Sequence, residues 1–193
     1  SGDSEFQSSA SVTITGTVDA DADYAIRLTD ADGNSKDVTG SLSGGSTSFS
    51  ETIALGSGFD GGAAAEGDLT VDADQNSSFQ VSQTSLTLQV DDTAPSVTNV
   101  EISNSTDSES SFVTNGETVD VSVEVDEANS IDNVSVDATA FGGSATQALS
   151  LESGDTFTGS FTASATETDV AENVSVTATD DAGNSESAAS NTL

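Results

Sequence analysis

Carboxylates are the side chains of this sequence that could do chemistry. The 193 residues include 34 Asp and Glu, and the formal charge is −32. Carboxylate oxygens are preferred ligands of Ca²⁺ and Mg²⁺, and a suitable pair of carboxyl groups can hydrolyse glycosides. Asp19, Asp21 and Asp23 alternate as at the start of an EF-hand loop, but Tyr24 stands where that loop needs Gly. We therefore expect no EF-hand, and interpret this cluster either as part of another cation site or as a solvated acidic turn.

The composition excludes several classes of function. His, Cys, Met and Trp are absent, so Ser–His–Asp and Cys–His catalysis and thiolate or imidazole zinc sites are ruled out. No pair of carboxylates stands out as acid and base, and we expect no enzyme. The two basic residues, Arg27 and Lys36, cannot neutralise a phosphate backbone, so nucleic acid is not an expected partner. No apolar run approaches the roughly 20 residues of a membrane helix, and we expect no direct membrane insertion.

The net charge limits the conditions under which the chain could stay folded. Like charges at this density repel one another and oppose a compact state. Concentrated salt relieves the repulsion, because the Debye length falls from about 10 Å at 0.1 M to about 3 Å at 1 M. Bound divalent cations would be a second remedy, and disorder is the third alternative. Periodic patterning of the apolar residues argues against disorder.

The elements that must position these carboxylates are short β-strands. Apolar and polar residues alternate with a period of two, which is typical of half-buried strands. The alternating apolar sets are Val12, Ile14 and Val18; Tyr24, Ile26 and Leu28; Phe79 and Val81; Leu86, Leu88 and Val90; Val119, Val121, Val123 and Val125; Val134 and Val136; Phe157 and Phe161; Val174 and Val176. Gly-, Asn- and Asp-rich turns separate the runs, and no amphipathic helical stretch occurs. This pattern predicts an all-β sandwich fold.

Two domains are expected. The only proline ends the segment Asp91–Pro95 near the middle of the chain, and Pro cannot donate to a central strand ladder. An internal repeat supports a junction there, because Glu66–Asp74 resembles Glu172–Asp180. Two sandwiches of about 95 residues fit the usual size of a domain. We therefore predict domains at 1–93 and 94–193.

Two motifs carry a resemblance to a known family. Asp91-Asp92-Thr93-Ala94-Pro95 resembles the D-x-T-A-P junction that opens Ig-like repeats of prokaryotic surface proteins. Val176–Asn184 resembles the V-x-A-x-D-x-A-G-N hairpin near the end of such repeats. With these two motifs and its acidity, the chain is similar to S-layer and surface-filament proteins of halophilic archaea. The resemblance covers 95–193 better than 1–94, and it implies two tandem Ig-like β-sandwich domains.

Calcium binding is implied by the same resemblance. Tandem extracellular sandwiches of this kind often hold Ca²⁺ between domains with linker carboxylates, which here would be Asp91 and Asp92. A cation there would neutralise repelling charges and stiffen the hinge. The other calcium candidates are two Asp-x-x-Gly-Asn turns: Asp30, Asp32 and Asn34, and Asp180, Asp181 and Asn184. The alternative for these turns is a structural one, in which the side chains hydrogen-bond the backbone of a hairpin. No other cofactor is expected.

Four Asn-x-Ser/Thr sequons could carry glycans if the protein is extracellular: Asn76, Asn104, Asn133 and Asn173. Several would also arise by chance in a sequence rich in Ser and Thr. Asn104 lies in a polar stretch, and we expect it to be the most accessible of the four. Asn133 and Asn173 lie at predicted strand starts.

The function expected from these features is a non-enzymatic structural module of an extracellular cell-surface assembly, either an S-layer or a filament, adapted to high salt. Its partners would be copies of itself or adjacent Ig-like domains of the same surface protein. Strand addition to an open sheet edge is one route of assembly, with residues 1–10 as the donor or linking strand. The alternative is a calcium-stiffened adhesin stalk or a ligand-binding module, for glycans or partner cells, which predicts an exposed aromatic cluster or one loop of divergent composition. The loop Gly56–Gly67, which contains Phe59, is either a contact for a ligand or a neighbour or a long connection within the sandwich.

Overall fold

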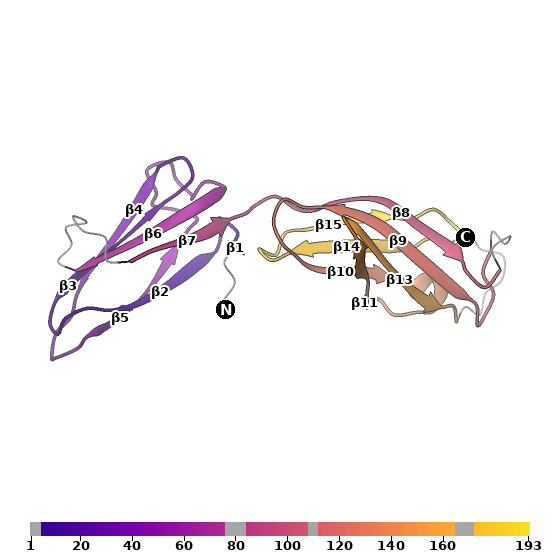
Figure 1. Ribbon diagram of the computed structural model, residues 1–193, viewed down its shortest axis with the longest axis horizontal. Coiled ribbons are helices and arrows are strands. Elements are labelled where there is room, and N and C mark those ends of the chain that lie inside the picture. The colour runs from indigo at the N-terminus through magenta and orange to yellow at the C-terminus, as the bar shows by residue number, and fades with distance from the viewer. Residues whose placement is uncertain (1–4, 76–83, 108–111, 165–171) are drawn as a thin grey trace. The chain divides into compact units, whose positions relative to one another are not determined.

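The computed structural model describes residues 5–75, 84–107, 112–164 and 172–193 (Figure 1). The chain divides into two compact units, Ser1–Asp92 and Thr93–Leu193, which we call unit 1 and unit 2. The sequence placed the boundary after residue 93. Each unit has its own hydrophobic core and is described by itself.

Unit 2 consists of two four-stranded sheets. In chain order its strands are β8 (Ser96–Asn104), β9 (Thr118–Asp126), β10 (Ile131–Asp137), β11 (Gln147–Ala148), β12 (Ser150–Ser153), β13 (Thr156–Thr162), β14 (Ser175–Asp180) and β15 (Ser185–Ala189), and a 3₁₀ turn, η1 (Thr139–Phe141), follows β10. The sheet orders are β12-β13-β9-β8 and β11-β10-β14-β15. Along the chain, β8 to β15 take the letters A, B, C, C′, D, E, F and G. The two sheet orders are then D-E-B-A and C′-C-F-G. This is the topology of an Ig-like sandwich.

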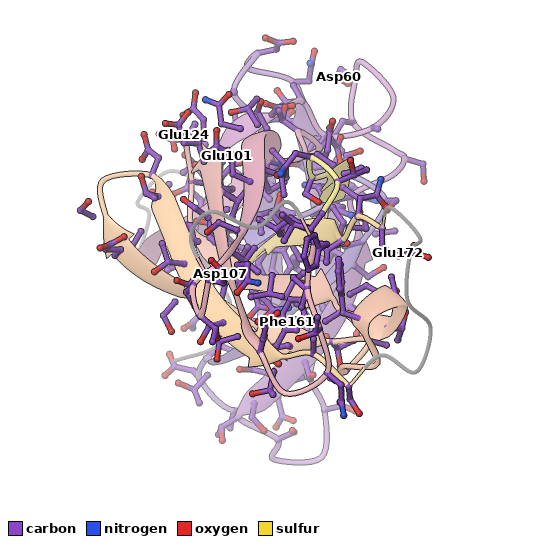
Figure 2. The ribbon with its side chains drawn as sticks, turned by 90° about the vertical axis from the view of Figure 1, so that its right-hand side faces the viewer. Asp60, Glu101, Asp107, Glu124, Phe161 and Glu172 are labelled. Carbon is purple, nitrogen blue, oxygen red and sulfur yellow. The ribbon has the colours of Figure 1, made fainter. Side chains whose placement is uncertain are left out.

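The core of unit 2 lies between the two sheets. Val119, Val121, Val123 and Val125 of β9 all point inward and are at most 2% exposed, as their alternation predicted. Phe161 of β13 lies among these core side chains (Figure 2), and its ring centroid is 5.8 Å from that of Phe141. Because β-branched side chains pack well on a pleated surface, the four Val residues favour the place of β9 at the centre of the sheet.

Unit 1 has the same kind of sandwich with fewer strands on one side. Its strands are β1 (Glu5–Phe6), β2 (Ser11–Thr17), β3 (Asp23–Thr29), β4 (Ser35–Ser41), β5 (Ser48–Ala54), β6 (Gly67–Gln75) and β7 (Thr84–Val90). The sheet orders are β1-β7-β6-β3-β4 and β2-β5. With the equivalent strands lettered as in unit 2, and β1 lettered A′, these orders are A′-G-F-C-C′ and B-E. Among the described residues, the second sheet of unit 1 therefore has no equivalent of strand A or strand D.

An aromatic stack marks the core of unit 1. Tyr24 of β3 and Phe49 of β5 lie parallel, with ring centroids 4.4 Å apart. Gly16 of β2 pairs with Phe49, and a Cβ atom at Gly16 would lie 2.5 Å from the Phe49 ring. Glycine at this position thus lets the phenyl ring lie flat on the β2 backbone. Most of the remaining core residues come from β3, β6 and β7.

The all-β fold predicted from the sequence is confirmed, and the prediction identified equivalent strands. The repeated segments around Leu69 and Val174 fall on or just before β6 and β14, which are strand F of their respective sandwiches. The expected strand at Phe79 and Val81 lies outside the described residues. Among the strands of seven or more residues, β4, β5 and β8 were not predicted, because their apolar alternation is interrupted by Gly, Glu or Asn.

Candidate functional site

The first candidate cation turn is a hydrogen-bonded hairpin between β3 and β4. Asp30 is 4% exposed, and its Oδ1 accepts hydrogen bonds from the backbone N–H groups of Asp32 (3.1 Å) and Asn34 (2.8 Å). Its Oδ2 accepts from the side-chain amide of Asn34 (3.2 Å) and from the backbone N–H of Ala65 (3.0 Å). The three-residue loop ends at Gly33, whose φ of 82° is the left-handed conformation of a G1 bulge.

The carboxylate of Asp30 is strongly held in its charged form. Burial by itself raises the pKa of Asp30, but the hydrogen bonds from Ala65, Asn34 and Asp32 together outweigh burial, and the pKa lies below its ordinary value. The bond from Ala65 also links this turn to the segment that precedes β6. Asp30 therefore fixes two parts of unit 1 that lie 35 residues apart in the sequence.

The second candidate turn repeats this geometry in unit 2, between β14 and β15. Asp180 is 1% exposed, and its two oxygens accept from the backbone N–H (2.8 Å) and the side-chain amide (2.9 Å) of Asn184. Gly183 again has a positive φ, 93°. The same five-residue pattern thus forms the C–C′ hairpin of unit 1 and the F–G hairpin of unit 2.

These contacts correspond to the structural alternative that the sequence left open for the two turns. A cation at Asp30 or Asp180 would compete with the N–H donors that already contact the carboxylates. The neighbouring Asp32 and Asp181 are exposed. In the described part of the chain, no group of three or more Asp and Glu side chains is gathered as a metal site would require.

The junction pair divides between two environments. Asp91 is fully buried in unit 1, and its backbone N–H donates to the carbonyl of Phe6 (2.9 Å). Asp92 is exposed, and its Oδ1 accepts from the backbone N–H of Ser8 (2.8 Å). Both residues thus extend the parallel pairing of β1 with β7, in which Glu5 faces Gln89. Calcium binding at Asp91 and Asp92 stays a prediction.

Both basic residues have structural contacts in unit 1. Arg27 of β3 makes a bidentate ion pair with its cross-strand neighbour Asp37, at 2.8 and 2.7 Å, and the two side chains are 39% and 42% exposed. Hydrogen bonding from Arg27 lowers the pKa of Asp37. Lys36 Nζ donates to the carbonyls of Ala54 and Ser57, both at 2.6 Å. Neither cation is therefore part of a basic patch.

The loop 56–67 is a packed connection within unit 1. Phe59 and Ala64 are buried in the core, and Ala64 N–H donates to the carbonyl of Leu55 (2.8 Å). Lys36 donates to the carbonyl of Ser57 and Asp30 accepts from the N–H of Ala65, so both ends of the loop are tied to the β3–β4 hairpin. This placement favours the interpretation that 56–67 is a connection within the sandwich over the interpretation that it contacts a ligand.

The expected accessibility of Asn104 is wrong. Asn104 is 3% exposed, and its amide donates to the carbonyl of Phe112 (3.1 Å) and to Glu117 (3.0 Å). Its Oδ1 accepts from the N–H groups of Thr106 and Asp107, at 2.9 and 3.1 Å. A polar stretch therefore surrounds a buried Asn that organises the turn after β8. Asn133 and Asn173 are exposed, and Asn76 lies outside the described residues.

Two hollows on the described surface each lie within one unit. The first, of about 360 Å³, lies at the side of unit 1 between β2 and the strands β6 and β7; we call it the lateral cleft. Its lining is Ile14, Thr15, Gly16, Thr17, Val18, Phe49, Val71, Ala73, Asp74, Gln75 and Leu86. Leu86 is 51% exposed. Sequence reasoning missed this cleft, because it lies at an edge of β2 with which no described strand pairs, and local patterns do not show strand pairing.

The second hollow, of about 510 Å³, lies on the outer face of the sheet β12-β13-β9-β8. Its lining includes the carboxylates of Glu101, Asp120 and Glu152 and the hydroxyls of Ser103, Ser122, Thr158 and Ser160. Figure 2 shows Glu101 and the nearby Glu124 projecting outward from unit 2. Among the aromatic residues that the structure describes, only Phe112 is exposed, so this part of the chain holds no exposed aromatic cluster.

Comparison with known proteins gives a distant structural similarity. No protein-family model matches the chain, and no curated protein matches it. Among solved structures, the chain is similar to a tetra-tandem repeat in the extending region of a large adhesion protein, with 22% sequence identity and a TM-score of 0.33. The match covers 97% of this chain and 46% of that one. The described residues include no helix long and apolar enough to cross a membrane.

Proposed function

We propose that this chain is a non-enzymatic structural module of an extracellular cell-surface assembly, a filament or an S-layer, that works at high salt. The observation that carries the proposal is that hydrogen-bonded polar side chains hold the fold together. Asp30, Asp180, Asn104 and Lys36 each hold a turn or loop of their own unit through hydrogen bonds. These polar side chains therefore stabilise a scaffold.

The charge distribution supports the high-salt part of the proposal. Unit 2 contains 18 Asp and Glu and no Lys or Arg, and unit 1 contains 16 Asp and Glu with Arg27 and Lys36. Within unit 2 no residue of opposite charge can offset the repulsion, so mobile cations must screen it. A halophilic surface is an environment in which such a composition is stable.

Electron microscopy of the purified chain tests the proposal. The protein is concentrated in molar sodium chloride and imaged, with a sample dialysed to low salt as the control. We expect ordered filaments or two-dimensional arrays at high salt and their loss at low salt. Monodisperse particles at every salt and protein concentration would contradict a role in assembly.

A further inference from the structure

The lateral cleft of unit 1 is the place where an Ig-like sandwich normally has another strand. In unit 2, strand β9 has neighbours on both sides, since β13 pairs with one edge and β8 with the other. Its equivalent in unit 1 is β2, which pairs with β5. Among the described residues, no strand pairs with the other edge of β2. Unit 2 thus shows what occupies this position in the same chain: an extended strand.

The backbone of β2 is oriented to accept such a strand. At its two ends, the carbonyl of Ala10 accepts from Leu55 N–H and the N–H of Val18 donates to the carbonyl of Thr47, both at 2.9 Å. Successive residues of an antiparallel strand alternate in the direction of their hydrogen-bonding groups. The even-numbered residues therefore face β5. The N–H and C=O groups of Thr13 and Thr15 point to the open edge.

The sequence of β2 lacks the features that normally keep an edge strand from pairing. Ser11–Val18 is rich in Thr, Val and Ile and contains no charge, in a chain with a formal charge of −32. Natural edge strands are commonly blocked by charges, bulges or covering groups. Strand β8 has such protection: a register shift occurs between Thr98 and Glu101, and the Asn191 side chain bonds both the N–H and the C=O of Ile102, at 2.8 and 3.1 Å.

Charge also favours this edge as the place where two copies can meet. Two copies of this chain repel each other over most of their surfaces, and the repulsion is weakest where a surface has no carboxylate. The open edge of β2 is such a surface, and Asp74 is the one acidic residue in the lining of the cleft beside it. An apolar side chain, Leu86, stands half exposed at the same place.

We infer that β2 of one copy pairs antiparallel with β2 of a second copy, which joins the two β2-β5 sheets into one and covers Leu86 in the lateral cleft. Because the same strand serves on both sides, the contact is isologous and forms a closed dimer. This inference deepens the proposed function and rests on it, since it names one of the contacts through which copies of the module associate; further contacts must link the dimers into a filament or an array.

Cysteine cross-linking tests the pairing directly, because the chain has no Cys of its own. Single variants Thr13→Cys and Thr15→Cys, alone and mixed, are oxidised in concentrated salt, with Thr52→Cys on the neighbouring strand as the control. Paired residues of an antiparallel sheet lie within the Cα distance of a disulfide, about 4.4–6.8 Å. We expect a cross-linked dimer from at least one of the three Thr13 and Thr15 samples. No more dimer from any of them than from Thr52→Cys would overturn the inference.

Two further variants separate assembly from folding. Thr15→Pro removes an N–H from the open edge and leaves the hydrogen bonds to β5, so we expect at least tenfold weaker dimerisation in sedimentation experiments with the unit 1 fold retained. Leu86→Asp should have the same effect, and Leu151→Asp, which changes another exposed Leu (59%) on β12, should have none. Dimerisation unchanged by Thr15→Pro and Leu86→Asp would refute the pairing.

Other outcomes are also decisive. If a double substitution of Phe79 and Val81 to Ser makes an otherwise monomeric protein dimerise, the chain's own segment occupies the cleft and the inference is wrong. Ordered arrays formed equally by the wild type and by Thr15→Pro would leave the proposed function standing and reject this contact. A wild type that never assembles and never dimerises would reject both.

Discussion

Replacement of Asp30 by Asn tests whether the buried turn carboxylate holds unit 1 together. The substitution keeps the shape of the side chain and one acceptor oxygen, which can still serve the N–H groups of Asp32 and Asn34. The new amide group, however, faces the N–H of Ala65, which then has no acceptor on this side chain. A hydrogen bond to a charged group contributes about 1.5–3 kcal/mol, and the remaining bonds become neutral and weaker. We therefore expect a loss of about 2–4 kcal/mol in the unfolding free energy of unit 1.

Asp180→Asn is the matched control. Asp180 has the same turn geometry, but its hydrogen bonds come from Asn184, within the turn itself. The partly exposed amide of Asn184 also donates to the carbonyl of Thr93 (3.3 Å), and it can turn to water when the acceptor is lost. We expect about 1 kcal/mol for this variant, since the hydrogen bonds to the Asp180 carboxylate come from within the turn and the contact to Thr93 is long.

The assay follows from the composition. Tyr24 is the only tyrosine of a chain without Trp, and it lies in the core of unit 1. Denaturant unfolding followed by tyrosine fluorescence therefore reports on unit 1, and calorimetry detects the transition of unit 2. If Asp30→Asn changes the stability of unit 1 by less than Asp180→Asn changes that of unit 2, the reasoning about Ala65 is wrong.

The dependence on pH gives an independent check. The folded-state pKa of Asp30 lies below its ordinary value of about 3.9, so its contribution is complete above that pH and is lost as the pH falls through the folded pKa. We expect the stability advantage of wild-type unit 1 over the Asp30→Asn variant to be present above about pH 4 and to shrink below it, because protonation of the other carboxylates affects both proteins alike. Parallel curves for the two proteins would contradict this assignment.

The remaining predictions concern salt, cations and the turn after β8. Circular dichroism in a sodium chloride series should show β structure lost at low salt and regained on its addition; full stability in dilute, calcium-free buffer would rule out both screening and metal dependence. Lys36→Met should destabilise unit 1 by about 1.5–3 kcal/mol, because two carbonyls lose a charged donor, and tyrosine fluorescence measures it. Asn104→Ala should lower the unfolding temperature of unit 2, whereas Asn133→Ala should leave it nearly unchanged, as calorimetry will show; equal effects would contradict the burial of Asn104. Calorimetric titration with Ca²⁺ tests the junction: binding that is lost in Asp91→Asn and Asp92→Asn variants supports a site there, and heats equal to buffer dilution reject it.

The sequence by itself determined the fold class. Alternation such as that of Val119–Val125 indicates a half-buried strand without reference to any distant residue, because the period of two is a local property of extended chain. The repeat that relates the segments of Leu69 and Val174 likewise identified the two F strands. The local pattern Asp-x-x-Gly-Asn also indicated the hairpins at Asp30 and Asp180, as one of two alternatives.

The tertiary structure decided what depends on residues far apart in the chain. Asn104 stands in a stretch that is polar throughout, and its burial depends on contacts with Phe112 and Glu117 that no local pattern shows. The contact between Asp30 and Ala65 spans 35 residues for the same reason. The open edge of β2 follows from topology alone: the sequence predicts the strand, but only the pairing of the other described strands reveals that β2 has one neighbour among them where β9 has two.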